Sequence, residues 1–140
     1  MRSWARFVRG RTAGTHAPRA IITLFDRTPR ILTGQGDAPV IAIDIDCMFS
    51  DVTAELVAWC HKHIGYTPAR VGKAPKALLV YRGPRGFRKW TGPWFADPLG
   101  GKHRVEILGE GQQFVAYAIH PDTKAEYEWQ DLTGDGIANA

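Results

Sequence analysis

Two acidic side chains close an apolar segment in a pattern that can bind a divalent metal. Asp44 and Asp46 stand at the end of the run 40–46, which reads Val-Ile-Ala-Ile-Asp-Ile-Asp. Side chains alternate between the faces of a strand, so both carboxylates point from one face, with Cα atoms about 7 Å apart. The isoleucines between them take the opposite face into a core. Carboxylate oxygens suit Mg²⁺ or Mn²⁺. The alternative is that these acids only end the strand and start a loop.

Length and composition set the class of protein. A chain of 140 residues with 44% hydrophobic residues suits one domain with a real core. No apolar run approaches the roughly 18 residues of a membrane span, and no apolar stretch of a secretory signal follows the basic N-terminus. We therefore expect a cytoplasmic protein without membrane contact. The two cysteines, Cys47 and Cys60, are too few for a disulfide framework, which fits a reducing compartment.

The charges are segregated along the chain. Residues 1–30 hold seven arginines and one acid, whereas residues 37–55 hold five acids and no base. Residues 70–104 then hold nine bases and one acid, and beyond Arg104 seven acids face one lysine. An acidic cluster beside a basic tract suits a metal-dependent enzyme that acts on a nucleotide or nucleic acid. Solvated surface charge is the alternative.

The patterns of hydrophobicity predict an α+β fold. We expect strands at 40–46, 77–81 and 127–129, a helix at 51–63, a hairpin of 103–108 with 112–118, a loop over 83–99, and short apolar segments at 20–25 and 30–35. This order favours a sheet with helices packed on one face. The predicted loop is longer than most connections, which makes it a candidate for function. We expect residues 1–29 to be a basic N-terminal arm and residues 30–140 to be the folded domain.

A third acid can join the first two. On the expected strand 103–108, Glu106 faces away from Val105 and Ile107. If this strand lies beside 40–46, Glu106 completes a cluster of three carboxylates with Asp44 and Asp46. Such acids repel one another without metals, so the cluster is seldom kept for structure alone.

Several segments, in the same order, resemble a known enzyme family. The segments are 40–46, 70–82, 105–121 and 127–129, and the third contains the distinctive run Glu-Ile-Leu-Gly-Glu-Gly-Gln-Gln-Phe-Val-Ala. They resemble the bifunctional DNA primase/polymerase (prim-pol) domain of the archaeo-eukaryotic primase superfamily, over roughly residues 30–130. The resemblance implies an RRM-like mixed or antiparallel sheet. It also implies nucleotidyl transfer, with two Mg²⁺ or Mn²⁺ ions on the catalytic acids Asp44, Asp46 and Glu106.

The resemblance also implies partners and a setting. The partners are a DNA template with its primer and an NTP or dNTP, with a helicase domain or protein alongside, in the replication of a phage or mobile element. The family's N-terminal unit is shortened here and its helices after Trp129 are missing, so we expect a partial catalytic core in which residues 1–29 are a remnant of that unit. Two alternatives stay open: a catalytically inactive remnant that binds nucleotide or nucleic acid, and a metal-dependent nuclease that uses the same acids.

The nucleotide contacts depart from the family pattern. The family's His near the incoming nucleotide falls at Leu78 in this sequence. Lys73, Lys76 and Arg82 flank that position and are the expected phosphate contacts, Lys as a point charge and Arg through two hydrogen bonds. His120 is expected to be a structural turn residue.

The long basic loop is the expected nucleic-acid contact. The candidate residues are Arg85, Arg88, Lys89 and Trp90, and further aromatic residues follow at Trp94 and Phe95. Aromatic rings among basic side chains can stack bases and hold a phosphate backbone. The alternative is that the loop folds over the core on its tryptophans.

Overall fold

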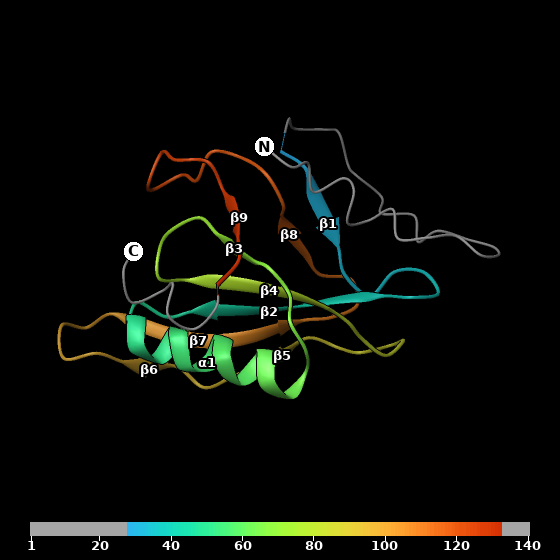
Figure 1. Ribbon diagram of the computed structural model, residues 1–140, viewed down its shortest axis with the longest axis horizontal. Coiled ribbons are helices and arrows are strands. Elements are labelled where there is room, and N and C mark those ends of the chain that lie inside the picture. The colour runs from blue at the N-terminus through green and yellow to red at the C-terminus, as the bar shows by residue number, and fades with distance from the viewer. Residues whose placement is uncertain (1–27, 133–140) are drawn as a thin grey trace.

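The computed structural model describes residues 28–132, and the expected segment 20–25 and nearly all of the basic arm lie outside them. These residues form nine strands and one helix (Figure 1). In chain order they are β1 (Arg30–Leu32), β2 (Val40–Asp46), α1 (Ser50–His63), β3 (Ala69–Val71), β4 (Ala77–Arg82), β5 (Trp90–Thr91), β6 (Phe95–Ala96), β7 (Lys102–Leu108), β8 (Gln113–Val115) and β9 (Glu128–Gln130). Over the described range, no helix is long and apolar enough to span a membrane.

The strands form one large sheet and one small sheet. The large sheet has the order β5-β7-β2-β4-β3-β9, and β6 pairs with β7 beyond this path. The small sheet consists of β1 and β8. All of these pairs are antiparallel. The α+β class and the antiparallel sheet are therefore confirmed, and a single helix, α1, stands where the prediction had helices on one face.

The two elements with the clearest local patterns form as expected. β2 places Ile43 and Ile45 in the core, because alternate side chains of a strand share a face. In α1 the buried residues Thr53, Val57 and Cys60 follow the spacing of a helical stripe.

The predicted hairpin of 103–108 with 112–118 is wrong. β7 pairs with β2 on one side and with β5 and β6 on the other, whereas β8 pairs with β1, with Ile31 opposite Phe114. The physical reason lies in the turn after β7. The buried side chain of Thr33 donates a 3.1 Å hydrogen bond to the carbonyl of Gln112, and the backbone N–H of Thr33 donates to the same oxygen at 2.9 Å. This anchor directs the chain away from β7 and toward β1.

The predicted loop over 83–99 is only partly irregular. It contains β5 and β6, which pair with β7 along the edge of the large sheet. β3 was not predicted, because three residues carry too short a pattern to identify a strand from sequence.

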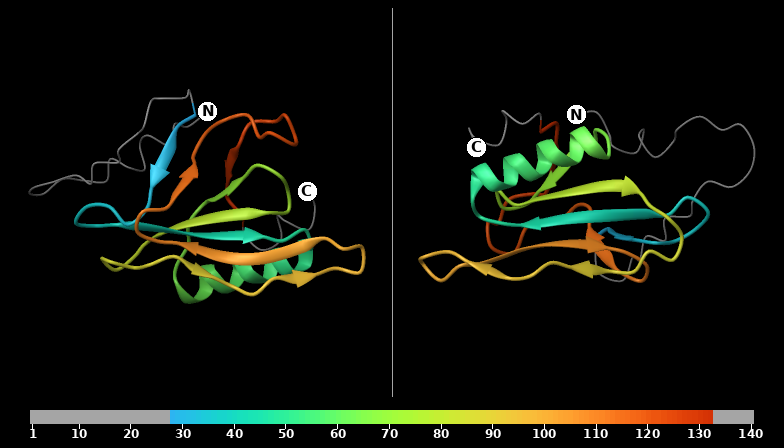
Figure 2. Two further views of the ribbon diagram at one scale, coloured as in Figure 1. Left: turned by 180° about the vertical axis from the view of Figure 1, so that it is seen from behind. Right: turned by 90° about the horizontal axis from the view of Figure 1, so that it is seen from below.

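Two apolar clusters cover opposite faces of the large sheet. On one face, Ile45 and Leu79 pack with Val57 of α1. On the other face, the second cluster includes Leu78 and Phe114 and lies beneath the small sheet. The views in Figure 2 show α1 along one side of the large sheet and the pair β1–β8 on the other. The side chains of Asp44 and Asp46 at the end of β2 are not part of either cluster.

Candidate functional site

One row of residues crosses six strands on the face of the sheet opposite α1. From β5 to β9 the directly paired residues are Thr91, Glu106, Asp44, Leu78, Arg70 and Trp129. Directly paired residues of antiparallel strands point from the same face. Asp44 and Glu106 are therefore immediate neighbours, and Asp46, two residues further along β2, shares their face. The expectation that the Glu106 strand lies beside the Asp44 strand is confirmed.

Asp44 and Arg70 form the charged centre of this row. Burial raises the pKa of Asp44, the positive charge of Arg70 opposes this rise, and the negative charges of Asp46 and Glu106 add to it. Arg70 is itself largely buried, which lowers the pKa of its guanidinium group, while Asp44 acts in the opposite direction. Its Nη1 donates a 2.6 Å hydrogen bond to the carbonyl of Val115. The fold thus fixes a partly buried cation near the partly buried carboxylate of Asp44.

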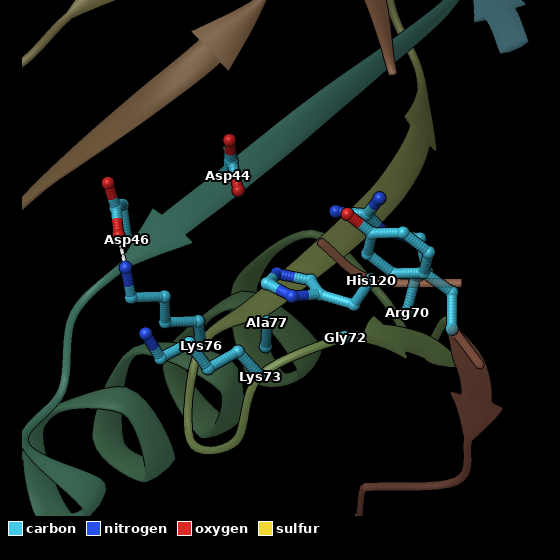
Figure 3. A pocket seen from close by; sticks show the side chains of 9 residues that line it. Asp44, Asp46, Arg70, Gly72, Lys73, Lys76, Ala77 and His120 are labelled. Carbon is cyan, nitrogen blue, oxygen red and sulfur yellow. Dashed lines mark ion pairs between the residues drawn. The ribbon is translucent and has the colours of Figure 1, made fainter. Parts of the chain in front are cut away.

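A pocket of about 150 Å³ opens beside β2 (Figure 3). Its lining residues are Asp44, Asp46, Arg70, Gly72, Lys73, Lys76, Ala77, His120 and Tyr127. Two carboxylates on β2 thus share the pocket with three cationic side chains from β3 and from the segment between β3 and β4. A pocket with this lining attracts an anion to the immediate neighbourhood of the acids.

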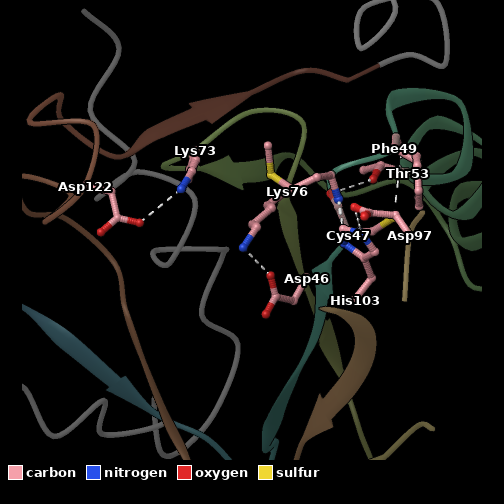
Figure 4. Close-up of polar contacts among 10 residues, drawn as sticks. Asp46, Cys47, Phe49, Thr53, Lys73, Lys76, Asp97, His103 and Asp122 are labelled. Carbon is pink, nitrogen blue, oxygen red and sulfur yellow. Dashed lines mark hydrogen bonds and ion pairs between the residues drawn. The ribbon is translucent and has the colours of Figure 1, made fainter. Parts of the chain in front are cut away.

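Two of the three predicted nucleotide contacts lie in this pocket. Lys76 Nζ lies 2.5 Å from Asp46 Oδ1, and Lys73 Nζ lies 3.1 Å from Asp122 Oδ2 (Figure 4). Arg82 does not join them. It lies at the far end of β4, opposite Val40, and its guanidinium group donates to a backbone carbonyl there.

His120 and Tyr127 are pocket residues that the sequence did not identify. His120 Nδ1 accepts hydrogen bonds from the backbone N–H groups of Asp122 at 3.1 Å and Thr123 at 3.3 Å. Since Nδ1 is the acceptor, Nε2 carries the proton and is a donor. His120 is thus a turn residue, as expected, and also a pocket residue. Its turn pattern signalled the first role, and only the long-range packing of the turn against β3 reveals the second.

The sequence places Arg70 only in the basic tract. Nothing in its local sequence shows that it lies near Asp44 on the same face of the sheet. The guanidinium carbon of Arg70 lies 4.4 Å from the centroid of the Tyr127 ring. This contact is a cation–π pair and helps to hold both side chains at the pocket wall.

Glu106 is surrounded by donors. Its Oε1 lies 3.0 Å from Lys89 Nζ and 2.9 Å from Arg104 Nη2, and it accepts a 3.2 Å hydrogen bond from Thr91 Oγ1. Its side chain is only 12% exposed. The acids therefore have basic residues on both sides: those of the pocket toward β3, and Lys89 with Arg104 toward β5.

The predicted nucleic-acid contacts are distributed over several places. Lys89 reaches Glu106, whereas Arg85 forms an ion pair with Asp37. Trp90 is paired with Ile107, so it points from the sheet face opposite the acids. Arg88 is exposed on the loop before β5. Of these four residues, the structure brings only Lys89 to the acidic cluster.

The donor set suits a magnesium or manganese ion, although Asp46 and Glu106 form ion pairs with basic side chains as they stand. Asp44, Asp46 and Glu106 offer carboxylate oxygens from two rigid strands on one face. Within residues 28–132, no three His, Cys, Asp or Glu side chains are gathered closely enough to hold a metal. Lys76 therefore has to leave Asp46, and Lys89 and Arg104 have to leave Glu106, before all three acids share an ion.

Comparison with protein-family models, with curated proteins and with solved structures finds no match to this chain. The function of the chain therefore has to be argued from the geometry of the site itself.

Proposed function

We propose that this protein carries out nucleotidyl transfer of the DNA primase/polymerase type, with Asp44, Asp46 and Glu106 as ligands for Mg²⁺ or Mn²⁺. The observation that carries the proposal is the direct pairing of Asp44 with Glu106, next to a pocket lined by cations. Residues far apart in sequence meet there on one sheet face. The proposal implies a primed DNA template and an NTP or dNTP as partners, with replication of a phage or mobile element as the setting.

The three acids would hold the metals on rigid strands. Two divalent ions bound there would lower the pKa of an attacking 3′-hydroxyl and stabilise the pyrophosphate that leaves when the hydroxyl attacks the α-phosphate. Burial keeps the pKa of Asp44 raised, and its acidic neighbours act in the same direction. Added positive charge at this place therefore favours the ionised carboxylate.

The pocket would bind the phosphates of the nucleotide. Arg70, Lys73 and Lys76 supply three positive charges, and His120 Nε2 supplies a hydrogen-bond donor. When Lys76 leaves Asp46, its ammonium group is available to a phosphate oxygen, so the same movement frees the carboxylate and binds the substrate. The pocket is smaller than the roughly 300–1,000 Å³ of a site that encloses a whole small molecule. We therefore assign it to the triphosphate, with the sugar and base outside.

Incorporation of a labelled dNTP on a primed template tests the proposal. We expect incorporation that requires Mn²⁺ or Mg²⁺. Asp44→Asn and Glu106→Gln should each reduce it by more than the roughly 10–100-fold that loss of an outer-shell partner costs a metal site. Glu55→Gln is the matched control, because Glu55 is an exposed acid on α1, on the other side of the sheet. Incorporation that is equal in all variants would contradict the proposal.

A second candidate is a binding module without catalysis. The ion pairs on Asp46 and Glu106 favour it, because they neutralise the acids without any metal. In that case the protein should bind labelled dNTP through the pocket, but no incorporation should appear with either metal.

A further inference from the structure

The pairing of the β5–β6 segment with β7 contains a bulge. Trp90 and Thr91 pair with Ile107 and Glu106, whereas Phe95 and Ala96 pair with His103 and Lys102. Between these pairs, residues 92–94 oppose only residues 104–105, so the segment has one extra residue. An extra residue changes which side chains point to each face of the sheet.

The bulge turns two neighbouring tryptophans to opposite faces. Trp90 shares the face of its partner Ile107, away from the acids. Trp94 lies on the acidic face, where the guanidinium carbon of Arg104 is 4.1 Å from its ring centroid. Arg104 is itself paired with Asp46 in the register of β2 and β7 and forms a 2.9 Å ion pair with Glu106. Trp94 is therefore tied to the site through a single side chain.

Trp94 leaves much of its ring open to solvent. Its residue is 53% exposed although Arg104 lies over the ring. Two interactions hold Arg104, one with the indole ring and one with Glu106, so the pair is ordered before any ligand binds. An exposed ring that is already ordered loses little side-chain entropy when a flat partner stacks on it.

The charge around Trp94 is positive. Arg104 lies over its ring, and Lys89 and Lys102 are exposed bases on the same edge segment and on β7. The nearby acids are already engaged, since Glu106 contacts two cations and Asp97 lies 3.0 Å from His103. An apolar protein partner gains nothing from this ring of cations, and a free phosphate makes no use of the indole. Single-stranded nucleic acid uses both features, because its nucleobases can stack on the indole ring and its phosphates can contact the cations.

We propose that Trp94 and Arg104 form a platform on which a nucleobase of single-stranded nucleic acid stacks. The nucleic acid lies along the β5–β6 edge, with its phosphates near the neighbouring lysine and arginine side chains. Under the proposed function, the bound nucleic acid is the template or the primer. Only this role, and not the binding itself, rests on the proposed function. The pocket lies toward β3 and the platform toward β5, so nucleotide and strand would reach the acids from opposite sides.

Binding of a fluorescein-labelled dT12 oligonucleotide, followed by anisotropy in EDTA with the full chain, tests the platform. We expect Trp94→Ala to weaken binding about 5- to 100-fold, the effect of losing one base–aromatic stack, and Trp94→Phe to retain most of the affinity. Trp59→Ala is the matched control, because Trp59 is 56% exposed on α1. Affinity should also fall as salt is raised. Absence of binding by the unaltered chain, or an equal loss with Trp59→Ala, would overturn the inference.

Two variants distinguish base stacking on Trp94 from nucleotidyl transfer. Asp44→Asn should abolish incorporation of dNTP and leave dT12 binding intact. Trp94→Ala should weaken dT12 binding and leave the binding of inorganic tripolyphosphate unchanged. If no incorporation occurs but dT12 binding depends on Trp94, the platform stands without the enzyme. If incorporation occurs and dT12 binding does not depend on Trp94, the platform is wrong and the enzyme stands. Circular dichroism spectra that match the unaltered chain show that each variant is folded.

Discussion

At Asp44, burial and the positive charge of Arg70 act on the pKa in opposite directions. Burial raises its pKa, and the charge of Arg70 lowers it. Arg70 is held in place by its hydrogen bond to Val115 and by the ring of Tyr127, so it cannot relax away from the acid without losing both contacts. The charge of Arg70 favours the ionised form of Asp44, which a metal needs, and the same guanidinium group lines the pocket, where it can attract an anion.

His103 and Asp97 form a second pair of polar residues, which does not line the pocket (Figure 4). His103 is buried between the rings of Phe49 and Phe95, with centroid distances of 4.8 and 5.4 Å. Its Nδ1 accepts the backbone N–H of Met48 at 3.3 Å, so its Nε2–H donates to Asp97 Oδ2 at 3.0 Å. This pair fastens the β6–β7 turn to the segment between β2 and α1.

Asp97→Asn should therefore lower stability in a pH-dependent way. The backbone N–H of Gly101, first, and then the hydrogen bond from His103 lower the pKa of Asp97 below its ordinary value of 3.8. A carboxyl with a lowered pKa in the folded state adds stability above the unfolded value and loses it as the pH falls through the folded value. In urea unfolding we expect the variant to be less stable than the unaltered chain at pH 7, and the difference to shrink below about pH 3.8. A difference that is constant from pH 7 to pH 2.5 would show that the Asp97 charge has no part in it.

At the scale of elements, local patterns and long-range pairing differ in how far the sequence predicts them. β2 and α1 follow from the spacing of their own apolar residues, and the position of Glu106 on β7 follows in the same way. The partner of β7 does not follow, because its nearest strand in sequence, β8, pairs instead with β1. The three acids could thus be proposed from sequence, whereas the hairpin was wrong.

The residues of the pocket, too, could be predicted from sequence only in part. Lys73 and Lys76 were expected near the nucleotide because they flank a motif on β4. His120 and Tyr127 come from a turn about fifty residues later, and their presence depends on how that turn packs on β3. Gly72 is the point of contact: an added Cβ would overlap the ring of Tyr127 and lie 2.7 Å from Cδ2 of His120.

Gly72→Ala should accordingly damage the pocket without unfolding the sheet. Overpacking of this kind costs about 1–3 kcal/mol, and the rings of Tyr127 and His120 have to move to relieve it. We expect the affinity for inorganic tripolyphosphate, measured by isothermal titration calorimetry, to fall about tenfold, equivalent to about 1.4 kcal/mol. Gly86→Asn is the control, because nothing lies within 4 Å of its added Cβ and Asn tolerates the φ of 71° at this position. Unchanged affinity in Gly72→Ala would mean that the pocket does not receive the phosphates.

At the scale of the whole molecule, the two faces of the large sheet differ in their contacts. One face packs against α1, and the other is shared between the small β1–β8 sheet and the acidic row. Along that second face the order is cationic pocket, acids, and then Arg104 with Trp94. The alternating blocks of charge in the sequence are thus brought side by side by the antiparallel pairing of β2 with β4 and β7. This arrangement suits a substrate with phosphates on both sides of the reacting group.

The most direct test of the proposed metal site is to locate the residues at which Mn²⁺ binds. We would add Mn²⁺ and a non-hydrolysable dNTP to ¹⁵N-labelled protein and follow the broadening of backbone amide signals caused by the paramagnetic ion. We expect the signals of residues 44–46 and 104–106 to broaden first, and this selectivity to disappear in an Asp44→Asn, Glu106→Gln variant. Broadening that is centred on the acids of 122–131 instead, or that is spread evenly over the chain, would contradict the proposed metal site.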